Sequence, residues 1–260
     1  MIRELRSDGE LRAACGDDDL VVWAAQGLRG RARAWALGDA VVSACPGVSR
    51  RDRLGVWGGT SCVVELVRHA LGELGATYRP FGEVELVREV TAKLDGVEES
   101  GRFSWMSLDR RHLDHGGLDG GGPDGGLDGG PDAGEAGWLD RGAEDEVAAL
   151  LAAGAPHSYA VPGVDGVSRW AGVRVDGVLA AVAADAWSAP SVGLLAGVAT
   201  EARFRGRGLA GRVCRWVSRE LVAAHGRAAL MVDDTNAAAI GLYERIGYRR
   251  LRVLASHVAG

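Results

Sequence analysis

Apolar positions in the second half of the chain change their spacing several times, and each change predicts a new element. Between 140 and 153 they recur at helical spacing, with Val147, Leu150 and Leu151 on one face. Acidic residues stand near the start of this segment, where a helix dipole favours them. Three runs typical of strands follow, at 170–175, 178–185 and 192–200.

The spacing then indicates how these elements are connected. Asp176-Gly177 separates the first two strand-like runs and predicts a hairpin turn. From Gly208 the apolar spacing is that of an amphipathic helix, with arginines on its other side. A strand at 228–232, a helix at 236–246 and a strand at 248–254 complete the order α, three strands, α, β, α, β.

The first half of the chain shows a fainter copy of this order. A helical pattern begins at Thr60 and a second one covers 83–94. The strand-like runs of this half are 20–25, 32–37, 40–45, 54–57, 76–79 and 102–106.

Between the two halves, residues 116–134 consist largely of Gly, Asp, Pro and Leu. A six-residue Gly/Leu/Asp unit that begins at Gly116 recurs nine residues later. A calcium-binding β-helix would need the order G-G-x-G-x-D and more copies, so a flexible linker is the better interpretation. We therefore predict an accessory α/β domain at 1–110, a linker at 111–137 and a second domain at 138–260.

Composition excludes several classes of protein. Apolar residues make up 47% and charged residues 25%, which is typical of a folded globular chain. The net charge of -5 argues against a general nucleic-acid binder. Lys93 is the only lysine, and the richness in Ala, Gly and Arg indicates a GC-rich bacterial genome.

The same composition gives an expectation about location. The N-terminus shows no apolar segment of the kind found in signal peptides, and no apolar run approaches the roughly 18 residues of a membrane span. We expect a cytoplasmic protein without a membrane partner. Its cysteines, Cys15, Cys45, Cys62 and Cys214, have neither C-x-x-C spacing nor nearby histidines, so we expect free buried thiols and no metal site.

The strongest chemical signal lies at 204–210, Phe-Arg-Gly-Arg-Gly-Leu-Ala, between a predicted strand and a predicted helix. Glycines allow close approach of the backbone to a pyrophosphate, and the free N–H groups at the start of a helix bind anions. Six arginines and no acidic residue lie between Arg203 and Arg219, which favours an anionic ligand over a merely exposed basic helix face. A Rossmann site fits only in part, and the absence of G-K-[ST] excludes a Walker loop.

These residues resemble the pyrophosphate loop of the GNAT acetyltransferase superfamily, whose pattern is Q/R-x-x-G-x-G/A. Arg205, Gly208 and Ala210 satisfy it, and a second register through Arg203 and Gly206 is also compatible. We prefer the first register because the helix then begins immediately after the loop. A second motif of the family, N-x-x-A-x-x-L-Y-x-x-x-G-F/Y, is matched downstream by Asn236, Ala239, Leu242, Tyr243, Gly247 and Tyr248.

The resemblance implies an α/β fold with a mixed α+β sheet in the C-terminal half, which binds acetyl-CoA as cosubstrate. It implies that 192–200 diverges from the neighbouring strand and that the pantetheine arm lies there. The cofactor-binding residues implied in this way are Val198, Ala199, Thr200, Arg205, Gly206, Arg207, Gly208, Leu209, Ala210, Asn236, Ala239 and Tyr243.

The implied reaction is direct attack of a neutral primary amine on the thioester in a ternary complex. Tyr243 is the candidate general acid for the departing thiolate, since a phenol can protonate a thiolate held beside it. The expected strand 192–199 contains no carboxylate, so the general base stays open among Asp185, Glu201, Asp233 and Asp234.

Other interpretations stay open as well. The C-terminal half is alternatively a non-catalytic acyl-CoA-binding regulatory module, or a phosphate-binding interaction domain of another kind. The N-terminal half lacks both motifs, because Trp57-Gly58-Gly59 stands where the arginine-glycine loop would be. It is either a degenerate GNAT-like half that helps to form the acceptor cleft or an unrelated α/β domain, and the acceptor is a small molecule or a peptide.

Overall fold

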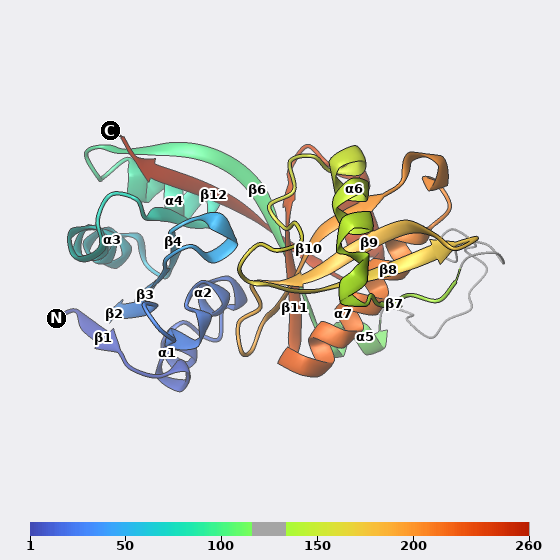
Figure 1. Ribbon diagram of the computed structural model, residues 1–260. Helices are drawn as coiled ribbons and strands as arrows, with labels where there is room; N and C mark the ends of the chain where they lie inside the picture. Colours follow the sequence, from blue (N-terminus) through green and yellow to red (C-terminus); the bar gives the residue numbers. More distant parts are fainter. Residues whose placement is uncertain (116–133, 260) are drawn as a thin grey trace.

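The structure is a computed structural model that describes residues 1–115 and 134–259. Its strands form one sheet of two lobes (Figure 1), in the order β1-β2-β3-β4-β5-β12-β6-β11-β10-β9-β8-β7. The first lobe is built mainly from the N-terminal half of the chain and the second mainly from the C-terminal half.

The N-terminal lobe begins with a short strand and two helices, followed by a meander of antiparallel strands. Strand β4 then pairs in parallel with β5 after the crossover helix α3. The elements are β1 (Arg3–Leu5), α1 (Asp8–Ala14), α2 (Asp19–Ala24), β2 (Arg33–Leu37), β3 (Ala40–Cys45), β4 (Arg53–Trp57), α3 (Thr60–Leu74), β5 (Arg79–Glu83), α4 (Val84–Thr91), β6 (Val97–Asp109) and α5 (Arg110–His115).

The C-terminal lobe repeats this order. Strands β8, β9 and β10 form an antiparallel meander, and β10 pairs in parallel with β11 after the crossover helix α7. The elements are β7 (Gly137–Trp138), α6 (Glu144–Gly154), β8 (Val167–Val175), β9 (Val178–Ala186), β10 (Gly193–Thr200), α7 (Leu209–His225), β11 (Arg227–Asp233), α8 (Ala237–Ile246) and β12 (Arg249–Val258).

The last strand of each half pairs with the other half. Strand β6 ends the N-terminal half but lies beside β11, while β12 ends the C-terminal half but lies beside β5. The two exchanged strands pair with each other antiparallel along ten residue pairs. Both chain ends therefore lie in the same lobe (Figure 1). The predicted domain division thus separates two stretches of sequence, each of which contributes a strand to the other lobe.

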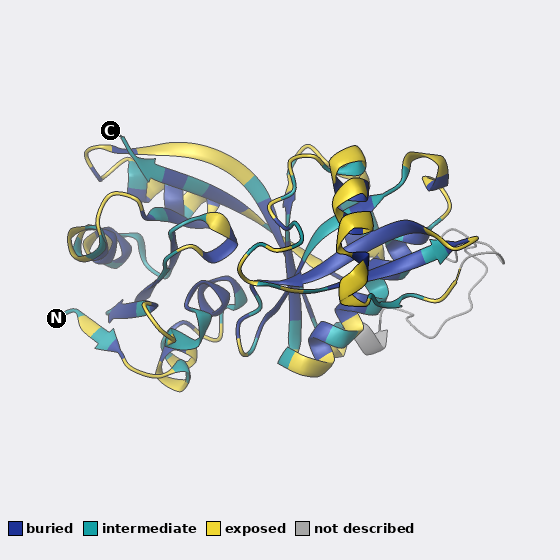
Figure 2. Cartoon of the chain, viewed as in Figure 1, coloured by how far each residue is buried: buried dark blue, intermediate teal, exposed yellow. Residues whose placement is uncertain are grey.

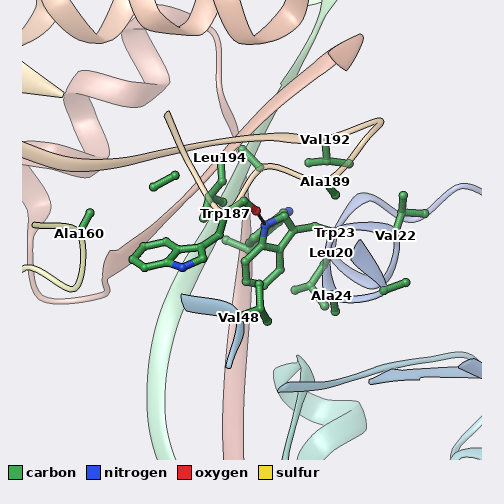
Figure 3. Close-up of a cluster of buried hydrophobic side chains, with 14 of the residues drawn as sticks. Leu20, Val22, Trp23, Ala24, Val48, Ala160, Trp187, Ala189, Val192 and Leu194 are labelled. Carbon is green, nitrogen blue, oxygen red and sulfur yellow. Dashed lines mark hydrogen bonds between the residues drawn. The ribbon is translucent and has the colours of Figure 1, made fainter. Parts of the chain in front are cut away.

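Three apolar clusters hold this sheet together. One lies beneath α3 and α4, and another lies beneath α7. The third cluster crosses between the lobes and joins Trp23 and Phe81 of the first half to Trp187 of the second. Figure 3 shows Trp23 and Trp187 in contact, where the Trp23 indole N–H donates to the Trp187 carbonyl at 2.8 Å.

Burial follows the expected alternation between core and solvent. The strands of the sheet are mostly buried, whereas the outer face of α6 is exposed (Figure 2). In the described part of the chain, no helix is long and apolar enough to cross a membrane.

Most predicted elements are confirmed, and the main error is the segment 20–25. It was predicted as a strand but lies in helix α2, which Asp18 caps by accepting a hydrogen bond from the Val21 N–H at 2.9 Å. All residues from Leu20 to Ala24 are buried, so their apolar run carries no period that distinguishes a helix from a strand. The strand predicted at 76–79 begins instead at Arg79. The predicted repeat at 116–134 lies almost wholly outside the described residues.

Candidate active site

Strands β10 and β11 separate in the middle of the C-terminal lobe. They pair only from Gly193 to Leu195 on β10, although β10 continues to Thr200 and β11 to Asp233. Beyond Leu195, the backbone groups of β10 that face β11 have no ladder partner. Because buried backbone groups need hydrogen bonds, this opening suits a ligand with amide groups of its own.

A bulge at Gly197 produces part of this opening. The register between β10 and β9 shifts between Ala196 and Ala199, and Gly197 has φ +61°. A Cβ atom at Gly197 would lie 2.5 Å from the Trp170 ring. Both the backbone conformation and the space therefore require glycine at this position.

The arginine-glycine loop lies at the N-terminus of α7, directly after β10. Gly206 and Gly208 both have positive φ, +77° and +75°, and Gly208 is the residue that precedes the helix. The first turn of α7 has no acidic residue and no capping side chain, so its free N–H groups are available to an anion. The helix begins at Leu209, which agrees with the preferred register of the motif.

The arginines of this region do not act as one cluster. Arg203 is paired with Glu201 at 2.6 Å, and Arg212 donates to the Gly134 carbonyl at 3.0 Å. The guanidinium of Arg207 lies 5.5 Å from the centre of the Phe204 ring. Among the described arginines of 203–219, Arg205 alone lines the cavity beside the opening, and its Nε donates to the Thr200 carbonyl at 3.4 Å.

The second motif forms helix α8 on the opposite wall. Asn236 caps the helix, since its side-chain oxygen accepts from the Ala239 N–H at 3.1 Å. Tyr243 lies two turns further along, is 6% exposed and packs edge-on against Tyr248 at 5.9 Å between ring centres. Burial raises the pKa of the Tyr243 hydroxyl well above its usual value, with smaller contributions from Cys214 and Tyr248, so the hydroxyl keeps its proton at neutral pH.

A cavity of about 920 Å³ joins these elements. Arg207 is the one predicted cofactor-binding residue that does not line it, because its side chain turns toward Phe204. The predicted residues that line it are Val198, Ala199, Thr200, Arg205, Gly206, Gly208, Leu209, Ala210, Asn236, Ala239 and Tyr243.

A second cavity, of about 650 Å³, adjoins the first on the other side of the opening between β10 and β11. The two share Leu195 to Gly197, Met231 to Asp233, His157 and Ser158. The far wall of the second cavity comes from the N-terminal half, through residues that precede or belong to β4, β5 and β6. A molecule bound in the first cavity can therefore contact a molecule bound in the second one, at the place where β10 and β11 separate.

The four carboxylates considered as general base differ in their surroundings. Asp185 is buried and accepts from Ser188 Oγ and Arg169, away from both cavities. Asp234 accepts from Ser104 Oγ and Arg250. Glu201 is paired with Arg203, and none of these three carboxylates lines either cavity.

Asp233 is the one of the four that lines both cavities. Its Oδ1 accepts from the Thr235 N–H at 2.8 Å and from Thr235 Oγ1 at 2.7 Å, and these bonds lower the pKa of the Asp233 carboxyl. A carboxylate stabilised in this way is a weak proton acceptor.

Sequence reasoning missed the residues that only the fold brings to the second cavity. His157 follows α6 and lines both cavities. Arg51, Arg53 and Arg79 line the second one from the N-terminal half. The basic run at 50–53 was visible in the sequence, but nothing in it shows which arginines face a cavity.

The cysteines are free, as expected, although only Cys15 and Cys214 are fully buried; Cys45 and Cys62 are partly exposed. Burial raises the pKa of the Cys214 thiol to about 12. Across residues 1–115 and 134–259, no group of three or more His, Cys, Asp or Glu side chains is placed to hold a metal ion.

Comparison with known proteins bears on the fold. Residues 172–255 match the family described as FR47-like protein. A search of curated proteins found no match. Among solved structures, a GCN5-related N-acetyltransferase from Kribbella flavida is 20% identical, with TM-score 0.58, over 92% of this chain and 95% of that one.

Two further structures are similar over the whole chain. A GCN5-related N-acetyltransferase from Sphaerobacter thermophilus is 13% identical, with TM-score 0.58, and the match covers 100% of this chain and 96% of that one. A Drosophila protein is 14% identical, with TM-score 0.58, over 99% of this chain and 98% of that one. Likeness at these identities shows a shared fold. The chain thus has the fold of GCN5-related N-acetyltransferases, and residues 172–255 of its C-terminal half match the FR47-like family.

Proposed function

We propose that the protein transfers an acetyl group from acetyl-CoA to a primary amine in a ternary complex. The observation that carries this proposal is the pair of cavities that adjoin at the splayed strands β10 and β11. One cavity contains the glycine loop and the helix N-terminus, which suit a pyrophosphate. The other is open to a second substrate, so direct transfer needs no covalent enzyme intermediate.

In this proposal the chain binds CoA through backbone groups more than through charge. The free N–H groups at the start of α7 hold the pyrophosphate, and Arg205 supplies a positive charge beside it. The unpaired edge of β10 from Val198 to Thr200 holds the pantetheine amides. A backbone N–H at the Gly197 bulge polarises the thioester carbonyl, as an oxyanion hole does.

Tyr243 serves the departing thiolate. Because its pKa is raised well above 10, the hydroxyl is always protonated at working pH and donates a hydrogen bond to the sulfur as negative charge develops. No hydrogen-bond partner holds this hydroxyl among the described residues, and Tyr243 lines the first cavity.

His157 is our candidate for the general base. It lines both cavities, whereas Asp233 is occupied by Thr235, and Asp185 and Asp234 face elsewhere. An imidazole is the commonest general base in enzymes, and general base catalysis typically contributes 10²- to 10⁴-fold. We expect His157→Gln to lower kcat by about that factor and Asp233→Asn to lower it less.

Two measurements test the proposed function. Titration calorimetry with CoA should show binding, and release of free thiol from acetyl-CoA should require an amine from a mixed panel. CoA binding without amine-dependent thiol release would support a non-catalytic regulatory module instead. If CoA did not bind at all, both interpretations would be wrong, and the loop would bind a different phosphate compound.

A further inference from the structure

The wall that the N-terminal half contributes to the second cavity is strongly basic. Arg51, Arg53, Arg79 and Arg102 line it, and Asp233 is the one carboxylate among its described lining residues. Arg102 is paired with Glu99 at 3.4 Å. The other three have no carboxylate within 4 Å in the described part of the chain, so their charge is not compensated by the protein.

The pairing of strands β4 and β5 makes Arg53 and Arg79 neighbours. They are directly paired residues of the parallel strands β4 and β5. Arg51 precedes Arg53 by two residues, and its guanidinium donates to the Tyr159 hydroxyl at 3.2 Å. Arg51, Arg53 and Arg79 line the same cavity as Tyr159, and all three lower the pKa of the Tyr159 hydroxyl, Arg51 most of all through its hydrogen bond.

The surroundings of Arg53 are the most informative. Arg53 is 6% exposed, and its Nε is buried without a hydrogen-bond partner among the described atoms. Its guanidinium lies 5.4 Å from the centre of the Phe81 ring. Burial lowers its pKa to about 10, and no carboxylate acts to raise it, yet the group stays charged at neutral pH. A buried charge without a partner is costly, and such groups normally have one.

We infer that the acceptor is a small primary amine that also carries an anionic group, a carboxylate or a phosphate, bound by Arg51, Arg53 and Arg79. This inference rests on the proposed function and names its substrate class. A guanidinium fork matches both kinds of anion in geometry. The cavity volume of about 650 Å³ is that of a small-molecule site. We call Arg51, Arg53 and Arg79 the arginine wall. With the anion bound there, the amine can face His157 and Asp233, which line the first cavity as well.

Matched pairs of amines test this. We would compare free amino acids with their carboxamides, and phosphoethanolamine with ethanolamine, by kcat/KM with acetyl-CoA. A hydrogen bond to a buried charge is typically worth about 10- to 100-fold in binding, and we expect at least one anionic member to exceed its neutral partner by that factor. A preference for the acids would identify a carboxylate, and a preference for phosphoethanolamine a phosphate.

Variants separate the arginine wall from other causes of such a preference. Arg53→Met and Arg79→Gln should reduce the anionic-over-neutral ratio to near 1, while the affinity for CoA stays unchanged. Since Arg79 is only half-buried, Arg79→Gln keeps the test valid if Arg53→Met fails to fold. Arg88→Gln is the matched control, because Arg88 is a partly exposed residue of α4, paired with Glu85 and outside both cavities. It should keep the ratio of the parent.

The outcomes distinguish this inference from the proposed function. Equal turnover of anionic and neutral partners would overturn the inference and leave acetyl transfer intact. If CoA binds but no amine is acetylated, the proposed function fails. The arginine wall is then judged by calorimetric titration of the same pairs into the CoA-loaded protein. Equal affinity for acid and carboxamide, and for phosphoethanolamine and ethanolamine, would overturn it there.

Discussion

At the scale of single residues, Tyr243 is the side chain proposed to stabilise the departing thiolate. Tyr243→Phe keeps the ring and its packing but removes the hydrogen-bond donor, so we expect kcat to fall by about 10²- to 10³-fold, with KM for acetyl-CoA nearly constant. Single-turnover kinetics would measure this.

Tyr248→Phe is the matched control, because its buried hydroxyl bonds to Ser218 Oγ at 2.7 Å and does not line the first cavity. It should cost about 1 kcal/mol of stability and leave kcat nearly unchanged. A raised KM with normal kcat in Tyr243→Phe would make Tyr243 part of the binding wall only.

Asp18 gives a residue-scale prediction about stability. Burial raises the pKa of the Asp18 carboxyl from 3.8 to about 6. The folded state therefore holds this proton more tightly than the unfolded chain. The corresponding stability is fully present below about pH 4 and is lost as pH rises through 6.

Asp18→Asn removes the charge and keeps an oxygen that can cap α2. We expect the free energy of unfolding to rise by up to about 2 kcal/mol at pH 7 and to change little at pH 4, as measured by urea denaturation. Asp145→Asn, at an exposed position of α6, is the control. An Asp18→Asn variant less stable than the parent at pH 7 would show that the carboxylate itself supports the cap.

At the scale of elements, helix α7 presents its N-terminus to the first cavity. Gly208→Val would place a side chain at φ +75°, block the approach of a pyrophosphate and raise the Kd for CoA by about tenfold or more. Gly226→Val is a matched control, since Gly226 ends the same helix at φ +83°, outside this cavity. Both variants should lose about 1–3 kcal/mol of stability through backbone strain, but only Gly208→Val should lose CoA affinity. Equal affinities in calorimetry would contradict the loop assignment.

Two arginines of this loop allow a second comparison. Arg205 lines the first cavity, whereas Arg207 lies over Phe204. We expect Arg205→Ala to weaken CoA binding, more so at low salt, where charge is least screened, and Arg207→Ala to change it little. Calorimetry at two salt concentrations would measure both. The reverse order of effects would mean that Arg207 turns toward the ligand on binding.

At the scale of the whole molecule, the exchange of β6 and β12 makes the lobes interdependent. Each lobe's sheet contains a strand from the other half, and one apolar cluster spans both. We expect a single unfolding transition, with equal calorimetric and van't Hoff enthalpies.

Core variants in each lobe test this cooperativity. Leu66→Ala on the buried face of α3 and Leu221→Ala on the buried face of α7 should each cost about 2–5 kcal/mol. Hydrogen exchange should then show both lobes destabilised together by either variant. A variant that loosened only its own lobe would indicate two independently folding units.

The sequence by itself determined the elements of the C-terminal half and the two motifs that resemble the GNAT family, because those signals are local. Helical spacing, the Asp176-Gly177 turn and the glycines of the 204–210 loop each act within a few residues. The tertiary structure decided what depends on distant partners. It made 20–25 a helix, exchanged β6 and β12, and brought His157 and Arg53 to one cavity. The pairing of β6 with β11 and β12 and the lining of the second cavity join residues more than a hundred positions apart, and no local period records such contacts.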